Sequence, residues 1–479
     1  MIMMNNLFKK FLTYSYGSVV GAAIAFITTM VTTRILSPEE FGKSSMYLLF
    51  VNLAMIVAVF GTDQAFVRFF YEEKENKRGA LLYNCLKISL IILLPMTIIV
   101  VIIRKQLSEF LFSDYNLLVF LALILSVGVH VLYRFGTLVI RMQQKGNLFS
   151  ILEILNKTLI LVGLVGFYSL LGNSYEVLIY SSALTFIILL IFLFYSQKEF
   201  WSLSNLTLSN QYHSKSEIFN YSYPLIFTTT IMWVFEGVDK FAIRQWANFN
   251  DLGLYTAAFK IIGLLTIIQT AFTTFWTPVA YETYQKDPNN TTLYSKVSKL
   301  ISFLMMLVGV IVIMMKDIII MLLGGEYEES GLMLSFLIFV PIMYTISETT
   351  VIGINFNKKV KLHIIIAITA CVVNFIGNWF LVPIYGGIGA SISTGVSYIL
   401  FFALRTFWSL RYYKVNYGLA KVYTSTIVLV FLASYTLLPT QPIHEQIVGV
   451  IAMILTLLIY SKDLAGLRKL TSKLKGRTN

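Results

Sequence analysis

Long apolar segments alternate with short polar ones along almost the whole chain. Each apolar segment is about 20 residues long, which is the length a helix needs to cross a hydrocarbon core about 30 Å thick. The segments are continuously apolar, whereas barrel strands alternate between apolar and polar residues. The pattern predicts an all-α polytopic membrane protein with about fourteen transmembrane helices, near residues 11–33, 42–62, 81–103, 116–140, 151–171, 176–196, 221–245, 253–278, 297–315, 330–354, 364–382, 388–409, 420–438 and 446–460.

The composition and the loop lengths agree with this pattern. Hydrophobic residues make up 57% of the chain and charged residues only 13%, about half the charged share of soluble domains. The longest inner connections span about 197–220 and 279–296, which leaves no polar domain to host a reaction. We therefore expect no catalytic residues and no enzymatic activity.

The basic residues predict how the chain is oriented. With the N-terminus inside, most of the 37 Lys and Arg residues fall on the inner side, in clusters such as Lys74 to Arg78 and Lys358 to Lys361. This is the positive-inside bias of membrane proteins. The bias places both termini in the cytoplasm. The net charge of +13 is thus a signal of topology and does not predict binding to nucleic acid, because the basic residues sit in short turns at a membrane surface.

Weak internal repetition predicts two similar halves. Glu40-Phe41-Gly42 opens the second predicted helix, and Asp251-Leu252-Gly253 opens the eighth, 211 residues later. Tyr133 and Tyr344, in the fourth and tenth helices, have the same offset. We predict a six-helix N-terminal lobe at 1–210, a six-helix C-terminal lobe at 211–415, and two additional helices with a basic cytoplasmic tail at 416–479. Transporters built from repeats bind their substrate between the halves.

The cysteines and histidines give no sign of a metal site. The two cysteines lie in apolar spans, and the four histidines are scattered along the chain without the spacing of metal ligands. We therefore expect neither a metal nor a cofactor.

Four strings of residues resemble one family of transporters. They are TTRILSPEEFG (Thr32 to Gly42), GTDQAFVRFFYEE (Gly61 to Glu73), DKFAIRQWANFNDLGLYTAAFKI (Asp239 to Ile261) and LVPIYGGIGASIST (Leu381 to Thr394). In this order, and on these helices, they resemble the bacterial oligosaccharide flippases of the polysaccharide transporter family, which include the O-antigen flippases. The match covers most of the chain.

The resemblance implies both a fold and an activity. It implies the superfamily of multidrug, oligosaccharidyl-lipid and polysaccharide exporters, with a V-shaped pair of helix bundles around a central cavity. The implied activity is the transfer of lipid-linked oligosaccharide repeat units from the inner to the outer leaflet of the bacterial cytoplasmic membrane by alternating access, for O-antigen, capsule or another surface polysaccharide. Its partners would be the lipid-linked oligosaccharide, membrane lipids, a polysaccharide polymerase and other assembly proteins, but no nucleic acid.

A polyprenyl diphosphate carries negative charge, so the cavity needs cations inside the membrane. Arg134 and Lys260 lie within spans and have no acidic residue nearby on their own helices. Lys157 and Lys240 each follow a glutamate by four residues, so neutralisation by Glu153 and Glu236 is the alternative to a cavity role. Arg34 closes the first helix and occupies a position of the family motif, with anchoring at the outer interface as its alternative. The predicted substrate-binding residues are Arg34, Arg134, Lys157, Lys240 and Lys260.

Acidic residues within the spans are the candidates for ion coupling. A buried carboxylate binds Na⁺ or exchanges a proton. Asp63, Asp239 and Glu348 are the candidates, and Glu348 has no cation nearby on its own helix. We expect Na⁺ or H⁺ to couple to transport at these residues.

Two other functions compete with the flippase hypothesis. A multidrug or cation antiporter of the same superfamily would favour an acidic cavity for cationic drugs, whereas this chain offers the cations Arg134 and Lys260. An integral membrane polysaccharide polymerase or ligase would need a large, charged outer loop, and the predicted outer turns are short. The pattern of charges therefore favours the flippase.

Overall fold

The computed structural model describes the backbone of residues 2–206, 213–439 and 441–475. Side chains are described in these ranges except at 2–15, 203, 206, 227–228, 231–232, 234–236 and 464–475. The described residues form helices and contain no strand. The prediction of an all-α polytopic membrane protein is therefore confirmed.

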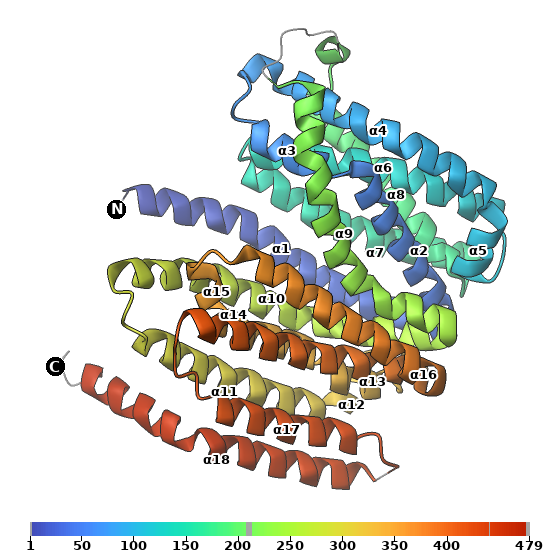
Figure 1. The fold of residues 1–479 in the computed structure, drawn as a ribbon. Coiled ribbons are helices and arrows are strands. Elements are labelled where there is room, and N and C mark those ends of the chain that lie inside the picture. The colour runs from blue at the N-terminus through green and yellow to red at the C-terminus, as the bar shows by residue number, and fades with distance from the viewer. Residues whose placement is uncertain (1, 207–212, 440, 476–479) are drawn as a thin grey trace. The chain divides into compact units, whose positions relative to one another are not determined.

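The chain divides into two compact units, and Figure 1 labels their helices. Unit 1 comprises 1–244 and 248–253, and unit 2 comprises 245–247 and 254–479. The predicted boundary between 210 and 211 lies outside the described residues, so the division into lobes stays a prediction. In the structure, most of α9, which follows this boundary, groups with unit 1.

The helices of unit 1 are α1 (Ile2–Ile35), α2 (Pro38–Val59), α3 (Thr62–Phe69), α4 (Arg78–Ile102), α5 (Arg104–Phe112), α6 (Leu117–Met142), α7 (Gly146–Leu171), α8 (Glu176–Ser196) and α9 (Lys215–Trp246), with short 3₁₀ turns at Glu75–Lys77 and Leu203–Leu206. The start of α2 shows how the sequence sets a helix end. The side chain of Ser37 accepts a hydrogen bond from the Glu40 amide, Pro38 is the first helical residue, and acidic residues fill the first turn. Each of these features favours a helix N-terminus.

Helix α1 packs closely on α7 because small residues face one another. A Cβ atom on Gly17 would lie 2.4 Å from the Cα of Ser150, and the Gly17 amide donates to the Ser150 hydroxyl at 3.3 Å. Contacts of this kind between helix backbones are common in membrane proteins. The contact at Gly17 and Ser150 places α7, which carries Lys157, alongside α1, whose last turn contains Arg34.

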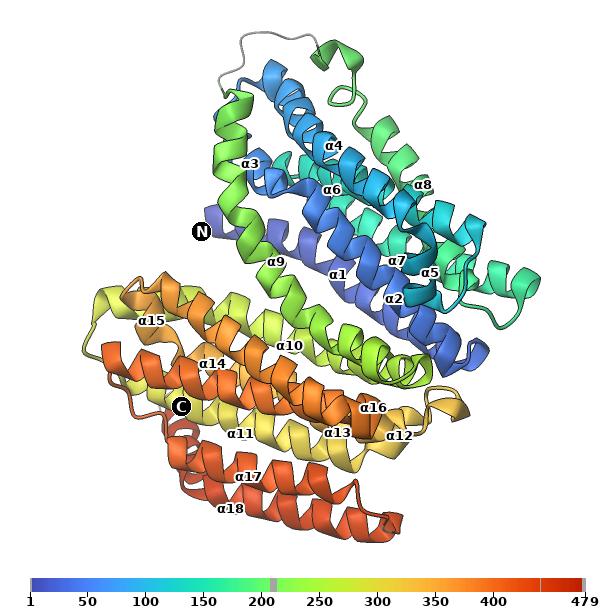
Figure 2. The ribbon, with the colours of Figure 1, turned by 45° about the vertical axis from the view of Figure 1, so that its right-hand side comes forward.

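The helices of unit 2 are α10 (Phe249–Lys286), whose first residues group with unit 1, α11 (Thr292–Met314), α12 (Lys316–Ile320), α13 (Ser330–Leu337), α14 (Phe339–Thr350), α15 (Ile352–Phe356), α16 (Val360–Tyr412), α17 (Leu419–Tyr435) and α18 (Pro442–Lys475), with a 3₁₀ turn at Gly325–Tyr327. Helices α17 and α18 run side by side in both ribbon views (Figures 1 and 2).

Helix α16 consists of two arms that fold back on each other at Gly386. This glycine has φ 54° and ψ −133°, which other residues rarely adopt. The side-chain amide of Asn374 donates from Nδ2 to the Thr394 hydroxyl at 3.1 Å, and a Cβ on Gly377 would lie 2.0 Å from the Ser393 hydroxyl oxygen. The two arms contain the predicted spans 364–382 and 388–409.

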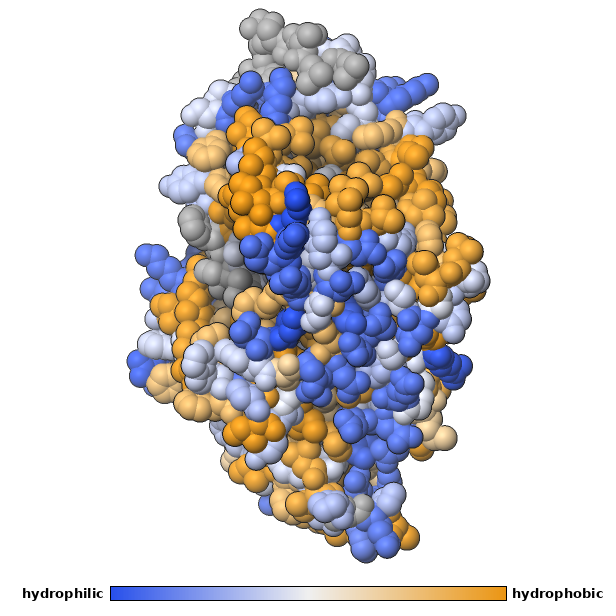
Figure 3. Space-filling model, turned by 90° about the vertical axis from the view of Figure 1, so that its right-hand side faces the viewer, coloured by the Kyte–Doolittle hydropathy of each residue, from blue (hydrophilic) through white to orange (hydrophobic). Residues whose placement is uncertain are grey.

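Eleven helices in the described part of the chain are long and apolar enough to cross a membrane. The fourteen predicted spans fall on α1, α2, α4, α6 to α11, the run from α13 to α15, both arms of α16, α17 and α18. Helix α17 has only 17 residues. Large apolar side chains remain exposed along these helices, such as Ile91 and Ile102 of α4 at 70% and 73%. Such exposed apolar side chains are expected of surface in contact with lipid. Figure 3 views the side on which many of the helices end, where hydrophilic side chains gather through the middle and hydrophobic ones lie mainly toward the margins.

Candidate functional site

The path of the chain is broken between α2 and α3. Phe60 and Gly61 both have positive φ angles, of 53° and 74°. A Cβ atom on Gly61 would lie only 2.6 Å from the carbonyl oxygen of Ser222 in α9, so this position requires glycine. The Thr62 hydroxyl donates to the Val59 carbonyl at 2.5 Å. The break therefore starts a new helix, α3, where α9 comes close.

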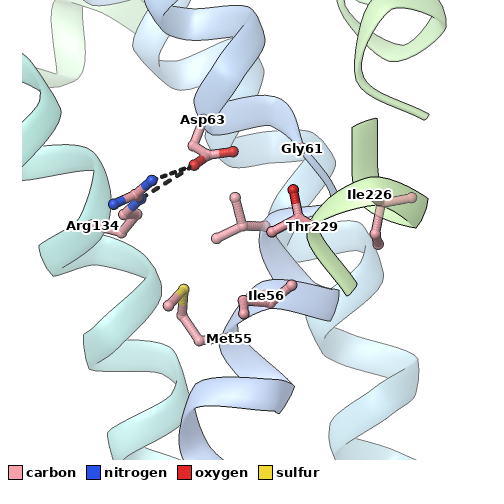
Figure 4. Close-up of a pocket in the computed structure, with 8 residues that line it drawn as sticks. Met55, Ile56, Gly61, Asp63, Arg134, Ile226 and Thr229 are labelled. Carbon is pink, nitrogen blue, oxygen red and sulfur yellow. Dashed lines mark hydrogen bonds and ion pairs between the residues drawn. The ribbon is translucent and has the colours of Figure 1, made fainter. Parts of the chain in front are cut away.

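Asp63 lies in the first turn of α3 and pairs with Arg134 of α6 (Figure 4). Arg134 donates from Nη2 at 2.7 Å and from Nε at 3.2 Å to the same oxygen, Oδ2 of Asp63. The negative charge of Asp63 is favourable at a helix N-terminus. Its side chain is 11% exposed, whereas that of Arg134 is 38% exposed. The pair therefore consists of a buried carboxylate that holds a partly exposed guanidinium.

A pocket of about 180 Å³ adjoins this pair (Figure 4). Its volume corresponds to about six water molecules at roughly 30 Å³ each, which fits a small headgroup and not a whole oligosaccharide. Within the described part of the chain, Nη1 of Arg134 forms no hydrogen bond, so the guanidinium keeps donors for a ligand. The pocket is otherwise largely apolar. Its lining residues are Met55, Ile56, Val59, Gly61, Asp63, Arg134, Ile226 and Thr229.

Unit 2 contains a second ion pair, which is more deeply buried. Arg405, on the second arm of α16, donates from Nη1 to Oε1 of Glu348 at 2.8 Å and to the Ser347 hydroxyl at 2.5 Å. The two charged side chains are 8% and 11% exposed. The guanidinium also lies over the rings of Tyr344 and Phe401. Since two charges so buried are tolerated only together, the pair fastens α14 to α16.

The two pairs involve helices that correspond in the predicted repeat, although the paired residues themselves do not. Tyr133 of α6 and Tyr344 of α14 share the offset of 211 residues. Arg134 and Glu348 lie on these same two helices, and each pairs with another helix of its own unit. The corresponding helices therefore carry charges of opposite sign. Neither residue has a partner on its own helix in the sequence, and the structure supplies each partner from a distant segment.

Arg34 and Lys157 lie on the neighbouring helices α1 and α7 of unit 1. Arg34 is exposed in the last turn of α1. Lys157 is half-buried, and its Cγ lies 3.7 Å from where a Cβ on Gly21 would be. No ion pair joins Glu153 to Lys157, although both side chains are described. The structure therefore does not favour the alternative, in which Glu153 neutralises Lys157.

The other predicted residues lie on α9 and α10. Asp239 is buried and Lys240 is half-buried on α9, while Lys260 is exposed on α10. The side chain of Glu236 lies outside the described residues. Of the eight predicted site residues, the structure joins Asp63 and Arg134 directly.

Arg405 was missed by the sequence analysis. It is the single basic residue of the predicted span 388–409, in the string FFALRTFW. The same signal, one cation within an apolar span, selected Arg134. Among the described residues, no group of three or more His, Cys, Asp or Glu side chains is placed to hold a metal ion, and the lack of a cofactor stays a prediction.

Comparisons with known proteins agree on a family and a fold. The profile of a family described as "Polysaccharide biosynthesis protein" matches residues 7–284. No curated protein matches the chain by sequence.

Two solved structures illustrate the fold. The lipid II flippase MurJ, in an inward closed conformation, superposes with a TM-score of 0.68 at 16% identity, over 95% of this chain and 100% of that one. An inward-facing multidrug resistance MATE family transporter of the MOP superfamily superposes with a TM-score of 0.61 at 16% identity, over 82% of this chain and 94% of that one. At these identities the likeness establishes the fold.

Proposed function

The chain belongs to the polysaccharide biosynthesis protein family, and we propose that it flips polyprenyl-diphosphate-linked oligosaccharide repeat units from the inner to the outer leaflet for surface polysaccharide synthesis. The family match and the fold shared with a flippase support this proposal. In it, the chain alternates access to a central cationic cavity, as repeat-built transporters do.

The observation that carries the proposal is the geometry of Arg134. Its guanidinium is held by Asp63 through Nε and Nη2, is partly exposed and adjoins a pocket large enough for a phosphate group. Arginine binds phosphate oxygens well because its planar donors match them. An arginine fixed by a buried carboxylate is therefore ready to bind a diphosphate without rearranging first.

We also propose a location, partners and a coupling ion. We place the protein in the bacterial cytoplasmic membrane, with both termini in the cytoplasm and with polysaccharide polymerase and other assembly proteins as partners. Na⁺ or H⁺ is the proposed coupling ion. Asp63 and Glu348 already hold arginines, so an ion that binds there has to displace or compete with an arginine. Asp239, buried in α9, is the third candidate.

A multidrug or cation antiporter shares the fold and is the alternative. A cavity for cationic drugs needs acidic groups that are open to the ligand. Asp63 and Glu348 are each held by an arginine and are only 11% exposed, so neither is open to a cationic ligand, which disfavours this alternative.

Reconstitution in vesicles tests the proposal. Purified protein is inserted into vesicles that carry undecaprenyl diphosphate with an attached oligosaccharide, and the leaflet of the lipid is followed with a sugar-oxidising reagent that cannot cross the membrane. We expect transfer between leaflets only in vesicles with the protein. Vesicles that instead show ion-driven efflux of a cationic dye, without movement of the lipid, would support the antiporter.

A further inference from the structure

One face of α10 carries a row of hydroxyl groups. Thr270, Thr274, Thr277 and Tyr281 follow one another at spacings of four, three and four residues. At 3.6 residues per turn, this spacing keeps them within about 60° of one another around the helix. All four side chains are exposed, and Tyr281 is 41% exposed. We call these four residues the hydroxyl strip.

The strip lies on a helix that is long and apolar enough to cross a membrane. Another side of the helix is exposed and apolar: Ile268 and Phe275, 100° or more around α10 from the strip, are 56% and 67% exposed. Thr270 and Thr274 satisfy their hydroxyl protons within the helix, but hydrocarbon offers the hydroxyl oxygens of the strip no hydrogen-bond donor. The strip is therefore suited to a polar ligand, and the side of α10 that carries Ile268 and Phe275 to lipid.

The strip is rich in hydrogen-bond acceptors. Thr270 and Thr274 donate their hydroxyl protons to the carbonyls four residues earlier, both at 2.8 Å. Their oxygens therefore keep lone pairs that face outward. Pro278, within α10, has no N–H to give to the carbonyl of Thr274.

Single exposed threonines also occur elsewhere, such as Thr424 of α17, which donates to the Ala420 carbonyl at 2.8 Å. A single threonine of this kind bonds its hydroxyl proton within its own helix and needs no ligand. Helix α10 differs because three threonines and a tyrosine succeed one another along about 16 Å of helix, at 1.5 Å per residue. Sugars present rows of hydroxyl donors of similar extent.

A cation lies on the same half of the helix. Lys260 is exposed and precedes Thr274 by fourteen residues, close to four whole turns. A ligand that lies along α10 would therefore meet a positive charge first and the acceptors of the strip next. A diphosphate joined to an oligosaccharide has its charge and its hydroxyl groups in this order.

We propose that the hydroxyl strip of α10, Thr270, Thr274, Thr277 and Tyr281, recognises the oligosaccharide of the transported lipid by accepting hydrogen bonds from its hydroxyl groups, with the diphosphate toward Lys260. This assignment rests on the proposed function and adds the residues that bind the sugar. The strip selects for the sugar, whereas Arg134 and Lys260 select for the charge.

Isosteric substitutions test this assignment. The triple variant T270V/T274V/T277V removes the hydroxyl groups and keeps the side-chain shape, and T270S/T274S/T277S keeps the hydroxyl groups. T424V is the matched control, since Thr424 is also exposed and donates the same kind of internal hydrogen bond. Affinity is measured in detergent for two probes, undecaprenyl diphosphate and the lipid-linked repeat unit extracted from the producing cells.

We expect the valine variant to bind the sugar-bearing lipid about 10- to 100-fold more weakly, as for the loss of a few neutral hydrogen bonds, and to bind undecaprenyl diphosphate like wild type. The serine variant and T424V should bind both probes like wild type. Unchanged affinity of the valine variant for the sugar-bearing lipid would overturn the strip, as would an equal loss for both probes. If wild-type protein binds neither probe, the proposed function itself fails.

Discussion

Gly42 and Gly253 lie 211 residues apart, and each packs against the backbone that begins the other's helix. A Cβ on Gly42 would lie 2.1 Å from the carbonyl oxygen of Phe249, and a Cβ on Gly253 would lie 1.8 Å from that of Pro38. Pro38 and Phe249 have the same offset of 211. The contact is therefore reciprocal, as in an interface between two copies related by a twofold axis. The reciprocal contact joins positions that correspond in the predicted repeat, and the duplication itself stays a prediction.

Adding a methyl group at either glycine should destabilise the protein. In both Gly42→Ala and Gly253→Ala, the new Cβ overlaps a backbone carbonyl, which cannot move aside as a side chain can. We expect each variant to lose about 1–3 kcal/mol, seen as a lower melting temperature in detergent. Gly166→Ala, where no atom lies within 4 Å of the added Cβ, should melt like wild type. Wild-type melting of both test variants would contradict the close crossing.

Arg134 should be needed for transport through its planar guanidinium and not through charge alone. Arg134→Ala should abolish polymer assembly, and Arg134→Lys should recover only part of it, because lysine lacks the paired donors. Assembly is measured as surface polymer per amount of expressed protein. Full activity of Arg134→Ala at normal expression would show that Arg134 does not bind the substrate.

A double variant separates stability from transport at the same pair. Arg134→Ala leaves the carboxylate of Asp63 buried without its cation, at a cost of about 1–2 kcal/mol after allowance for the exposure of Arg134. Adding Asp63→Ala should restore the melting temperature and leave transport lost. Recovery of transport together with stability would mean that the pair is purely structural.

The Glu348–Arg405 pair should contribute mainly to the stability of unit 2. Arg405→Met leaves Glu348 as an unpaired buried charge and should lower the free energy of unfolding by about 3–5 kcal/mol. Adding Glu348→Gln to this variant should recover most of the loss, as measured by thermal unfolding. A single variant that is as stable as wild type would show that the ion pair does not fasten α14 to α16.

Lys260 should matter for transport, and another lysine of the same helix should not. Lys260→Ala removes a cation from the exposed half of α10 and should lower polymer assembly several-fold. Lys286, at the end of α10, is 74% exposed and pairs with Glu282 in the preceding turn, so Lys286→Ala is the control and should have no effect. Equal effects of both substitutions would indicate a loss of general surface charge.

The positions of the helices could be predicted from hydropathy, because each span needs its own apolar length whatever it packs against. The Pro and Gly residues of LVPIYGG predicted a turn between two spans, where the structure has the hairpin of α16 at Gly386. The partner of Arg134 could not be found in this way, because a search for partners along one helix reaches only residues three or four positions away. Asp63 lies 71 residues earlier. Arg405 could have been predicted as a lone cation in an apolar span. Its pairing with Glu348 could be found only from the structure.

The most direct measurement is the fate of lipid-linked repeat units in cells depleted of this protein. The leaflet in which they lie is determined with an impermeant reagent on spheroplasts, while surface polymer is measured in parallel. The flippase account predicts that repeat units accumulate in the inner leaflet and that surface polymer is lost. Unchanged pools of lipid-linked repeat units, together with altered sensitivity to cationic dyes, would contradict it.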